Sequence, residues 1–168
     1  MMSAEDVIMV GAVIFTLAIA FFASHYVLNT MYTSMIGNAQ LNSSAQAVIV
    51  LQAGKQSTNQ MDYVVFGAFI ALVLGIIITG WFVGGSTIFM VLYFFVWIIA
   101  VILGAVFSNT WETVSQASIF GSTILSFPLT NNIMTNLPTY LTVVGFLGII
   151  AMFAKPYFAQ AGGGSNEY

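Results

Sequence analysis

Charged side chains are almost absent from this sequence. Asp, Glu, Lys and Arg make up 4% of its 168 residues, whereas soluble domains carry about 25%. The chain has no arginine and only two lysines, Lys55 and Lys155, so it lacks the clustered basic surface that nucleic-acid binding requires. We therefore expect an integral membrane protein whose partner is the lipid bilayer and which does not bind nucleic acid.

Residues that carry catalysis or hold cofactors are equally scarce. Cysteine is absent, which excludes disulfides, thiolate chemistry and cysteine-based metal sites. The only histidine is His25, whereas a metal or haem site normally needs several ligands. The sequence contains no P-loop, no dinucleotide fingerprint and no serine-nucleophile motif. We expect no enzymatic activity, no cofactor and no metal.

Hydrophobic residues make up 60% of the chain, and they gather in long runs. Four runs without Asp, Glu, Lys or Arg are long enough, at about 18–22 residues, to cross the hydrocarbon layer as helices. They are Val7–Leu28, Tyr63–Val83, Ile88–Phe107 and Leu137–Ala154. The sequence therefore predicts an all-α polytopic protein with both termini on one side of the membrane. Residues 1–160 would form a single helical domain, and residues 161–168 a mobile tail.

The second and third runs are separated only by Gly84–Thr87. So short a break forces the two helices to return antiparallel, which predicts a transmembrane hairpin over Asp62–Phe107. The hairpin is expected to act as a scaffold rather than a site, because it holds no charge between Tyr63 and Phe107.

The first long connector, Asn29–Met61, is largely neutral and polar. Inside it Ala45–Ala53 is apolar but too short to span, which predicts a short helix at the interface or against the bundle. In the alternative, the first span continues through Met35 as a helix that protrudes from the bilayer.

The second long connector covers Ser108–Pro138. Asn109 and Glu112 have the spacing of a helix cap and its third residue, so a short helix is predicted to start at Thr110. Pro128 interrupts the segment before it could cross a membrane. We expect an interfacial or re-entrant helix that is shielded by protein, because lipid cannot satisfy open backbone groups.

Small residues recur at every fourth position on two of the spans. Such stripes let membrane helices approach closely, so these residues are predicted to pack helix against helix: Gly67, Ala71, Gly75 and Thr79 on the second span, and Ala100 and Gly104 on the third.

Three polar side chains remain as functional candidates, because ionisable groups in or near a membrane are often functional. His25 lies near the end of the first span, where it could be a polar anchor or part of a histidine ring in an oligomer. Asp62 is a plausible N-cap of the second span, and Glu112 a partner of the predicted cap at Asn109.

Four peptides carry a resemblance to a known class of proteins. They are ITGWFVGG (Ile78–Gly85), FSNTWE (Phe107–Glu112), FPLTNNIM (Phe127–Met134) and MFAKPY (Met152–Tyr157). Together they resemble small membrane proteins of tailless viruses that carry a lipid layer under the capsid. The resemblance covers roughly the C-terminal half and implies a structural protein of a virion membrane, held in many copies against capsid proteins.

Two functional hypotheses follow from these observations. The first is a structural or assembly protein of a lipid membrane, specifically a virion membrane protein that packs in many copies, as a homo-oligomer or with other membrane proteins, and contacts capsid proteins. The alternative is a pore-forming or transport-accessory subunit in which His25 and polar connector residues line an opening.

Overall fold

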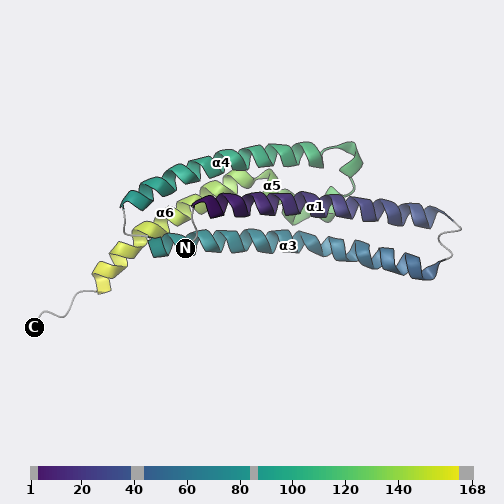
Figure 1. Cartoon of the computed structure of the whole chain (residues 1–168), viewed down its shortest axis with the longest axis horizontal. Coiled ribbons are helices and arrows are strands. Elements are labelled where there is room, and N and C mark those ends of the chain that lie inside the picture. The colour runs from purple at the N-terminus through teal and green to yellow at the C-terminus, as the bar shows by residue number, and fades with distance from the viewer. Residues whose placement is uncertain (1–3, 39–43, 84–86, 163–168) are drawn as a thin grey trace, which may run out of the picture.

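Four long helices run side by side along one axis (Figure 1). The computed structural model describes residues 4–38, 44–83 and 87–162. Within them the chain forms five α-helices and two short 3-10 helices. They are α1 (Ala4–Gly37), α3 (Ala45–Val83), α4 (Thr87–Ser115), η1 (Ser118–Phe120), η2 (Ile124–Ser126), α5 (Pro128–Thr135) and α6 (Leu137–Gly162).

The four predicted spans are confirmed as long apolar helices. The segments long and apolar enough to cross a membrane are Met9–Gly37, Ala45–Phe82, Met90–Ser115 and Leu137–Ala154. The described part of the chain contains no strand, as the all-α class requires. α1 begins and α6 ends at the same end of the bundle (Figure 1). Helices suit this composition because they satisfy their own backbone hydrogen bonds without water.

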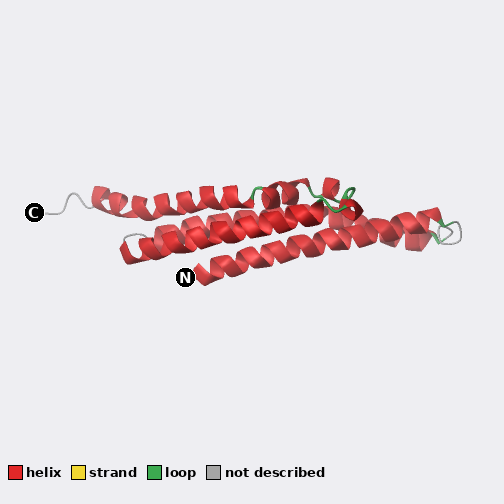
Figure 2. Cartoon of the chain, turned by 90° about the horizontal axis from the view of Figure 1, so that it is seen from above, coloured by secondary structure: helices red, strands yellow, loops and turns green. Residues whose placement is uncertain are grey.

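The hairpin of α1 and α3 extends well past the other helices (Figures 1 and 2). The expectation of a separate short helix at Ala45–Ala53 is wrong, because these residues form the start of the continuous helix α3. The continuation of the first helix through Met35 is confirmed, since α1 extends to Gly37; its protrusion from the bilayer stays a prediction. Close packing supports this extension: a Cβ at Gly54 of α3 would lie 3.8 Å from the Leu28 side chain of α1.

The predicted helix start at Thr110 is also wrong, because α4 continues without a break from Thr87 to Ser115. Polar side chains inside its last turns bond within the helix rather than capping a new one. The hydroxyl of Thr110 donates to the carbonyl of Val106 at 2.8 Å, and that of Thr113 donates to the carbonyl of Asn109 at 2.9 Å. The break comes only after Ser115, and α5 then returns beside α4.

Two expectations concern residues that the structure describes only in part or not at all. Ala161 and Gly162, predicted as part of a mobile tail, belong to α6; the rest of that tail, 163–168, lies outside the described residues. The Gly84–Gly85 break between α3 and α4 also lies outside them.

The predicted small-residue stripe of α3 is wrong in part. Gly67 and Ala71 are exposed, and a Cβ at Gly67 would meet no atom within 4 Å. Gly75 and Thr79 are half-buried. α3 instead buries the neighbouring face, which carries Val65, Phe69, Leu72 and Ile76. Four-residue spacing identifies a helix face but does not say which face turns inward.

Small residues do bring α4 and α6 together. Gly104 of α4 is buried, and a Cβ there would lie 2.5 Å from Leu141 of α6; Ala100, one turn away, is half-buried. Gly145 of α6 lies directly against the Trp97 indole, whose Nε1 donates to the carbonyl of Leu141 at 3.1 Å. Small residues thus give the large rings of α4 room against the backbone of α6.

We predict that Gly145→Ala destabilises the protein, because the added methyl group collides with the Trp97 ring and breaks its hydrogen bond to α6. The expected cost is about 1–3 kcal/mol, measured by titration with sodium dodecyl sulfate and circular dichroism. Gly67→Ala is the matched control: its methyl group meets open space, so stability should stay unchanged or rise by up to about 1 kcal/mol. Equal effects of the two substitutions would contradict the packing described here.

A buried polar layer as the candidate functional site

Buried polar side chains gather at the end of the bundle from which the α1–α3 hairpin extends. They come from every helix except α6 and from the segment between α4 and α5. We call them the polar layer: His25, Thr58, Asp62, Ser108, Ser115, Thr123 and Thr130. The buried core toward the other end is apolar and includes Ile14, Ala18, Leu72, Ile76 and Val144.

Asp62 holds the beginning of α5. α5 starts at Pro128, and no side chain of the preceding residue caps it. The Thr130 N–H donates to Asp62 Oδ1 at 2.7 Å, and the Leu129 N–H donates to Asp62 Oδ2 at 3.1 Å. Pro128 has no N–H to satisfy, so the two oxygens serve the two free N–H groups of the first turn. A negative charge is also favourable at a helix N-terminus.

The prediction that Asp62 caps its own span is therefore wrong. Asp62 lies in the middle of α3, a helix of 39 residues, and caps a different helix that is distant in sequence. Its carboxylate is 3% exposed, so the two hydrogen bonds replace the water that it loses. Asp62 thus acts as a positioning residue for α5.

Ser108 holds the other end of α5. Its hydroxyl donates to the carbonyl of Thr135, the last residue of α5, at 2.6 Å. That carbonyl lies in the last turn, where helix carbonyls have no partner inside the helix. α5 is thereby tied to α3 at its start and to α4 at its end.

Aromatic rings fill the space between these polar contacts. Trp111 of α4 is fully buried, and its indole Nε1 donates to Asn131 Oδ1 of α5 at 3.0 Å. Phe22 of α1 packs against Trp111 and Phe127, with ring centroids 5.2 and 5.8 Å apart. These rings join α1, α4 and the beginning of α5 in one cluster.

His25 is paired inside the chain. Its Nδ1 lies 2.9 Å from Thr58 Oγ1, and the Thr58 hydroxyl donates to the carbonyl of Lys55 at 2.9 Å. Because that hydroxyl proton is already used, Nδ1 carries the hydrogen and donates to Thr58. The imidazole is 2% exposed and lies edge-on to Phe127. The contact links α1 to α3, which agrees with His25 as a polar anchor.

Two hydroxyls in this layer have no partner among the described residues. Thr123 Oγ1 and Thr130 Oγ1 are buried and accept or donate no hydrogen bond. A buried unpaired hydroxyl costs about 1–3 kcal/mol.

Glu112 does not join the polar layer. Its side chain is exposed and accepts a hydrogen bond at 2.9 Å from Nε2 of Gln116, the residue that follows the end of α4. Of the three polar candidates, His25 and Asp62 make structural contacts in the polar layer, whereas Glu112 lies on the surface.

Sequence reasoning missed Thr58, Ser108 and Asn131 as members of this site. Each is a common polar residue without a motif, and each becomes distinctive only through a partner far away in the chain. Trp111, a lone tryptophan in a polar stretch, is the one residue of the cluster that carries a signal in the sequence. Within the described ranges, no three His, Cys, Asp or Glu side chains come together as metal ligands.

We predict that Asp62→Ala destabilises the protein by about 1–3 kcal/mol, because it leaves two buried N–H groups of α5 without acceptors. Hydrogen exchange at Leu129 and Thr130 should accelerate, and proteolysis should increase between α4 and α6. Glu112→Gln is the control and should change stability by less than about 0.5 kcal/mol. Unchanged exchange at both amides in Asp62→Ala would contradict the capping role.

Comparisons of the chain with family models, with curated proteins and with solved structures find no match. The resemblance of four peptides to viral membrane proteins consequently stays a prediction. The function has to be argued from the geometry of the helices and from their surfaces.

Proposed function

We propose that the protein is a structural or assembly component of a lipid membrane, which contacts neighbouring proteins through the end of the α1–α3 hairpin. We call this end the stem: residues 29–37 of α1 and 45–57 of α3. The observation that carries the proposal is that the stem extends beyond the rest of the bundle (Figure 1).

The length of the helices supports a position of the stem outside the hydrocarbon layer. α1 has 34 residues and α3 has 39, which at a rise of about 1.5 Å per residue gives about 51 and 58 Å. The hydrocarbon layer is about 30 Å thick. A layer of that thickness leaves about 20 Å of α1, and somewhat more of α3, outside it.

The polar layer agrees with this placement. Asp62 and Ser108 lie at the ends of the predicted spans, where a bilayer changes from hydrocarbon to headgroups. Polar groups at that depth are far less costly than at the bilayer centre. The stem therefore begins at the membrane surface and projects away from it.

The surface of the stem is suited to protein contacts. It exposes the large apolar side chains Met31, Ile36, Ile49 and Val50. Its only charged residue is Lys55, whose ammonium group lies 5.3 Å from the centre of the Tyr32 ring. Apolar exposure with depletion of charge is typical of the core of protein interfaces.

We propose a virion membrane beneath a capsid as the setting, with many copies side by side and their stems against capsid proteins. The resemblance of the four peptides supports this setting. The stem supplies the reach that such contacts need, and the outward apolar faces of the spans supply the contact with lipid. An assembly role in a cellular membrane would use the same surfaces.

The pore-forming alternative receives less support from these contacts. It requires His25 and the connector residues to face an opening, whereas His25 is buried against Thr58 and Phe127. Both carboxylate oxygens of Asp62 accept hydrogen bonds from backbone N–H groups at the start of α5. Their polar atoms serve the fold of one chain, so they add nothing to a shared aqueous path.

We predict that the chain co-sediments with lipid-containing particles when the producing culture is fractionated on a density gradient. Its ratio to the major capsid protein should be fixed and high, because the proposed role needs many copies. The measurement is quantitative mass spectrometry after chymotryptic digestion, since two lysines and no arginine leave trypsin few sites. A chain that remains in host membranes and never enters particles excludes the virion setting.

A second prediction tests the stem itself. The chain has no cysteine, so Val50→Cys carries a single thiol at an exposed stem position. Labelled with a benzophenone maleimide and irradiated in native membranes or particles, it should form adducts with a neighbouring protein. Ile102→Cys is the matched control: the position is also exposed, at 59% against 68% for Val50, but lies on the span part of α4, and it should react mainly with lipid. Equal protein adducts at both positions would argue against a stem-specific contact.

A further inference from the structure

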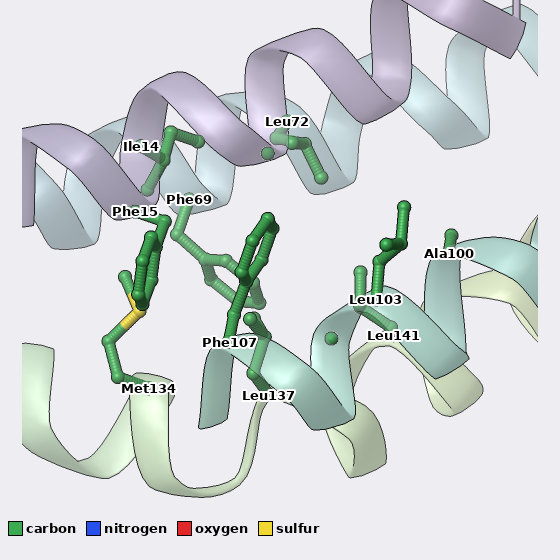
Figure 3. A pocket seen from close by; sticks show the side chains of 12 residues that line it. Ile14, Phe15, Phe69, Leu72, Ala100, Leu103, Phe107, Met134, Leu137 and Leu141 are labelled. Atoms are coloured by element: carbon green, nitrogen blue, oxygen red, sulfur yellow. The ribbon is translucent and has the colours of Figure 1, made fainter. Parts of the chain in front are cut away.

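An apolar crevice lies between α1 and α4, away from the polar layer. It has a volume of about 50 Å³, and its lining side chains are all apolar. Figure 3 shows these side chains converging from α1, α3, α4 and the region of α5 and α6. Buried residues such as Ile14, Leu72 and Leu137 form its floor. Gly11, Ala100 and Leu103 at its rim are only half-buried, so the crevice reaches the surface.

The crevice follows from where large and small residues fall on the two helices. Phe15 of α1 and Phe107 of α4 stack with ring centroids 4.5 Å apart, which sets the distance between the helices. One turn before Phe15 lies Gly11, and α4 presents Ala100 and Gly104 two and one turns before Phe107. These small residues do not fill the space that the stacked rings hold open.

The position of the crevice restricts what can occupy it. The lining residues of α1, α3 and α4 all belong to the candidate membrane spans, so the opening faces hydrocarbon. Water is unsuitable, because a buried water needs two to four polar partners. An empty space is unfavourable, since the atoms around it lose their dispersion contacts on one side.

The size of the crevice distinguishes between a lipid chain and a protein helix. A helix with side chains is about 10 Å wide, far too large for the space. The volume is about one third of the 150 Å³ of an apolar cavity that takes up benzene or xenon. A space of this size accepts a few methylene groups, and a bilayer offers these at every point of the opening.

We infer that the crevice is a binding site for the acyl chain of a bilayer lipid, which inserts its end between α1 and α4. The occupant is recognised by shape and by its lack of polar atoms, with no contribution from the headgroup. This inference does not depend on the proposed assembly function, because it concerns only the spans and not the stem. It makes a bound lipid chain part of the packing between α1 and α4.

The experiment uses the full chain in phosphatidylcholine vesicles that contain a small fraction of lipid with a diazirine near the end of one acyl chain. After irradiation, mass spectrometry locates the lipid adducts. We expect at least threefold more adducts on Phe15, Ala100 and Leu103 than on Ile102 and Val106, which face outward from the same turns of α4. Uniform labelling of the exposed faces would overturn the inference.

Two glycine substitutions give a matched test. A Cβ at Gly11 and a Cβ at Gly67 would each meet no atom within 4 Å, but only Gly11 lines the crevice. Gly11→Leu should lower the crevice adducts at least threefold, and Gly67→Leu should leave them unchanged. Equal loss in both variants would overturn the inference.

Ala100→Leu fills the crevice from the opposite wall and should act as Gly11→Leu does. If neither variant folds by circular dichroism, the distribution of adducts in the unmodified chain decides alone. Intermolecular crosslinks at the rim without lipid adducts would also overturn the inference, because a second copy would then cover the opening.

Discussion

The backbone of α5 depends on the Asp62 carboxylate. Long helices satisfy their own amide groups, but a helix of eight residues leaves a large share of its N–H and C=O groups at its ends. Asp62 accepts the N–H groups of Leu129 and Thr130, and Ser108 donates to the last carbonyl. The return from α4 to α6 is possible near a membrane because side chains of α3 and α4 replace the water that would otherwise solvate these groups.

Packing elsewhere in the bundle depends on pairing large rings with small residues. α6 presents Gly145 and Gly148 where α4 presents Trp97 and Tyr93, so backbone and ring meet directly. Between α1 and α4 the large rings are not paired with small residues. Phe15 stacks on Phe107, and the small residues beside this stack leave a crevice. One pair of helices is closed by protein alone, whereas the other has a space that matches a lipid chain.

The proposed function assigns different roles to the interior and the outside of the protein. The side chains of His25, Asp62 and Ser108 make hydrogen bonds within the chain, and the bonds of Asp62 and Ser108 join α3 and α4 to α5. The stem beyond the layer is nearly uncharged and exposes apolar side chains. Under the proposed function, the spans would anchor the protein in lipid and the stem would present a contact site at a fixed distance from the membrane.

The sequence by itself determined the class and the four spans. Four long apolar runs without charge predict membrane helices, because a helix satisfies its own backbone hydrogen bonds in lipid. The spans Tyr63–Val83 and Leu137–Ala154 fall within helices as predicted. The four-residue spacing of small residues also predicted that Gly104 packs closely against another helix. In the structure Gly104 is buried against Leu141 of α6.

Only the tertiary structure decided which partner each polar residue takes. Asp62 and Glu112 both have spacings that fit a local cap, yet one caps a distant helix and the other remains on the surface. Gly67 and Ala71 face outward because packing, not spacing, selects the buried face of α3. In the stem α1 and α3 lie against each other, as Gly54 lies against Leu28, and such contacts between distant segments cannot be read from a local sequence pattern.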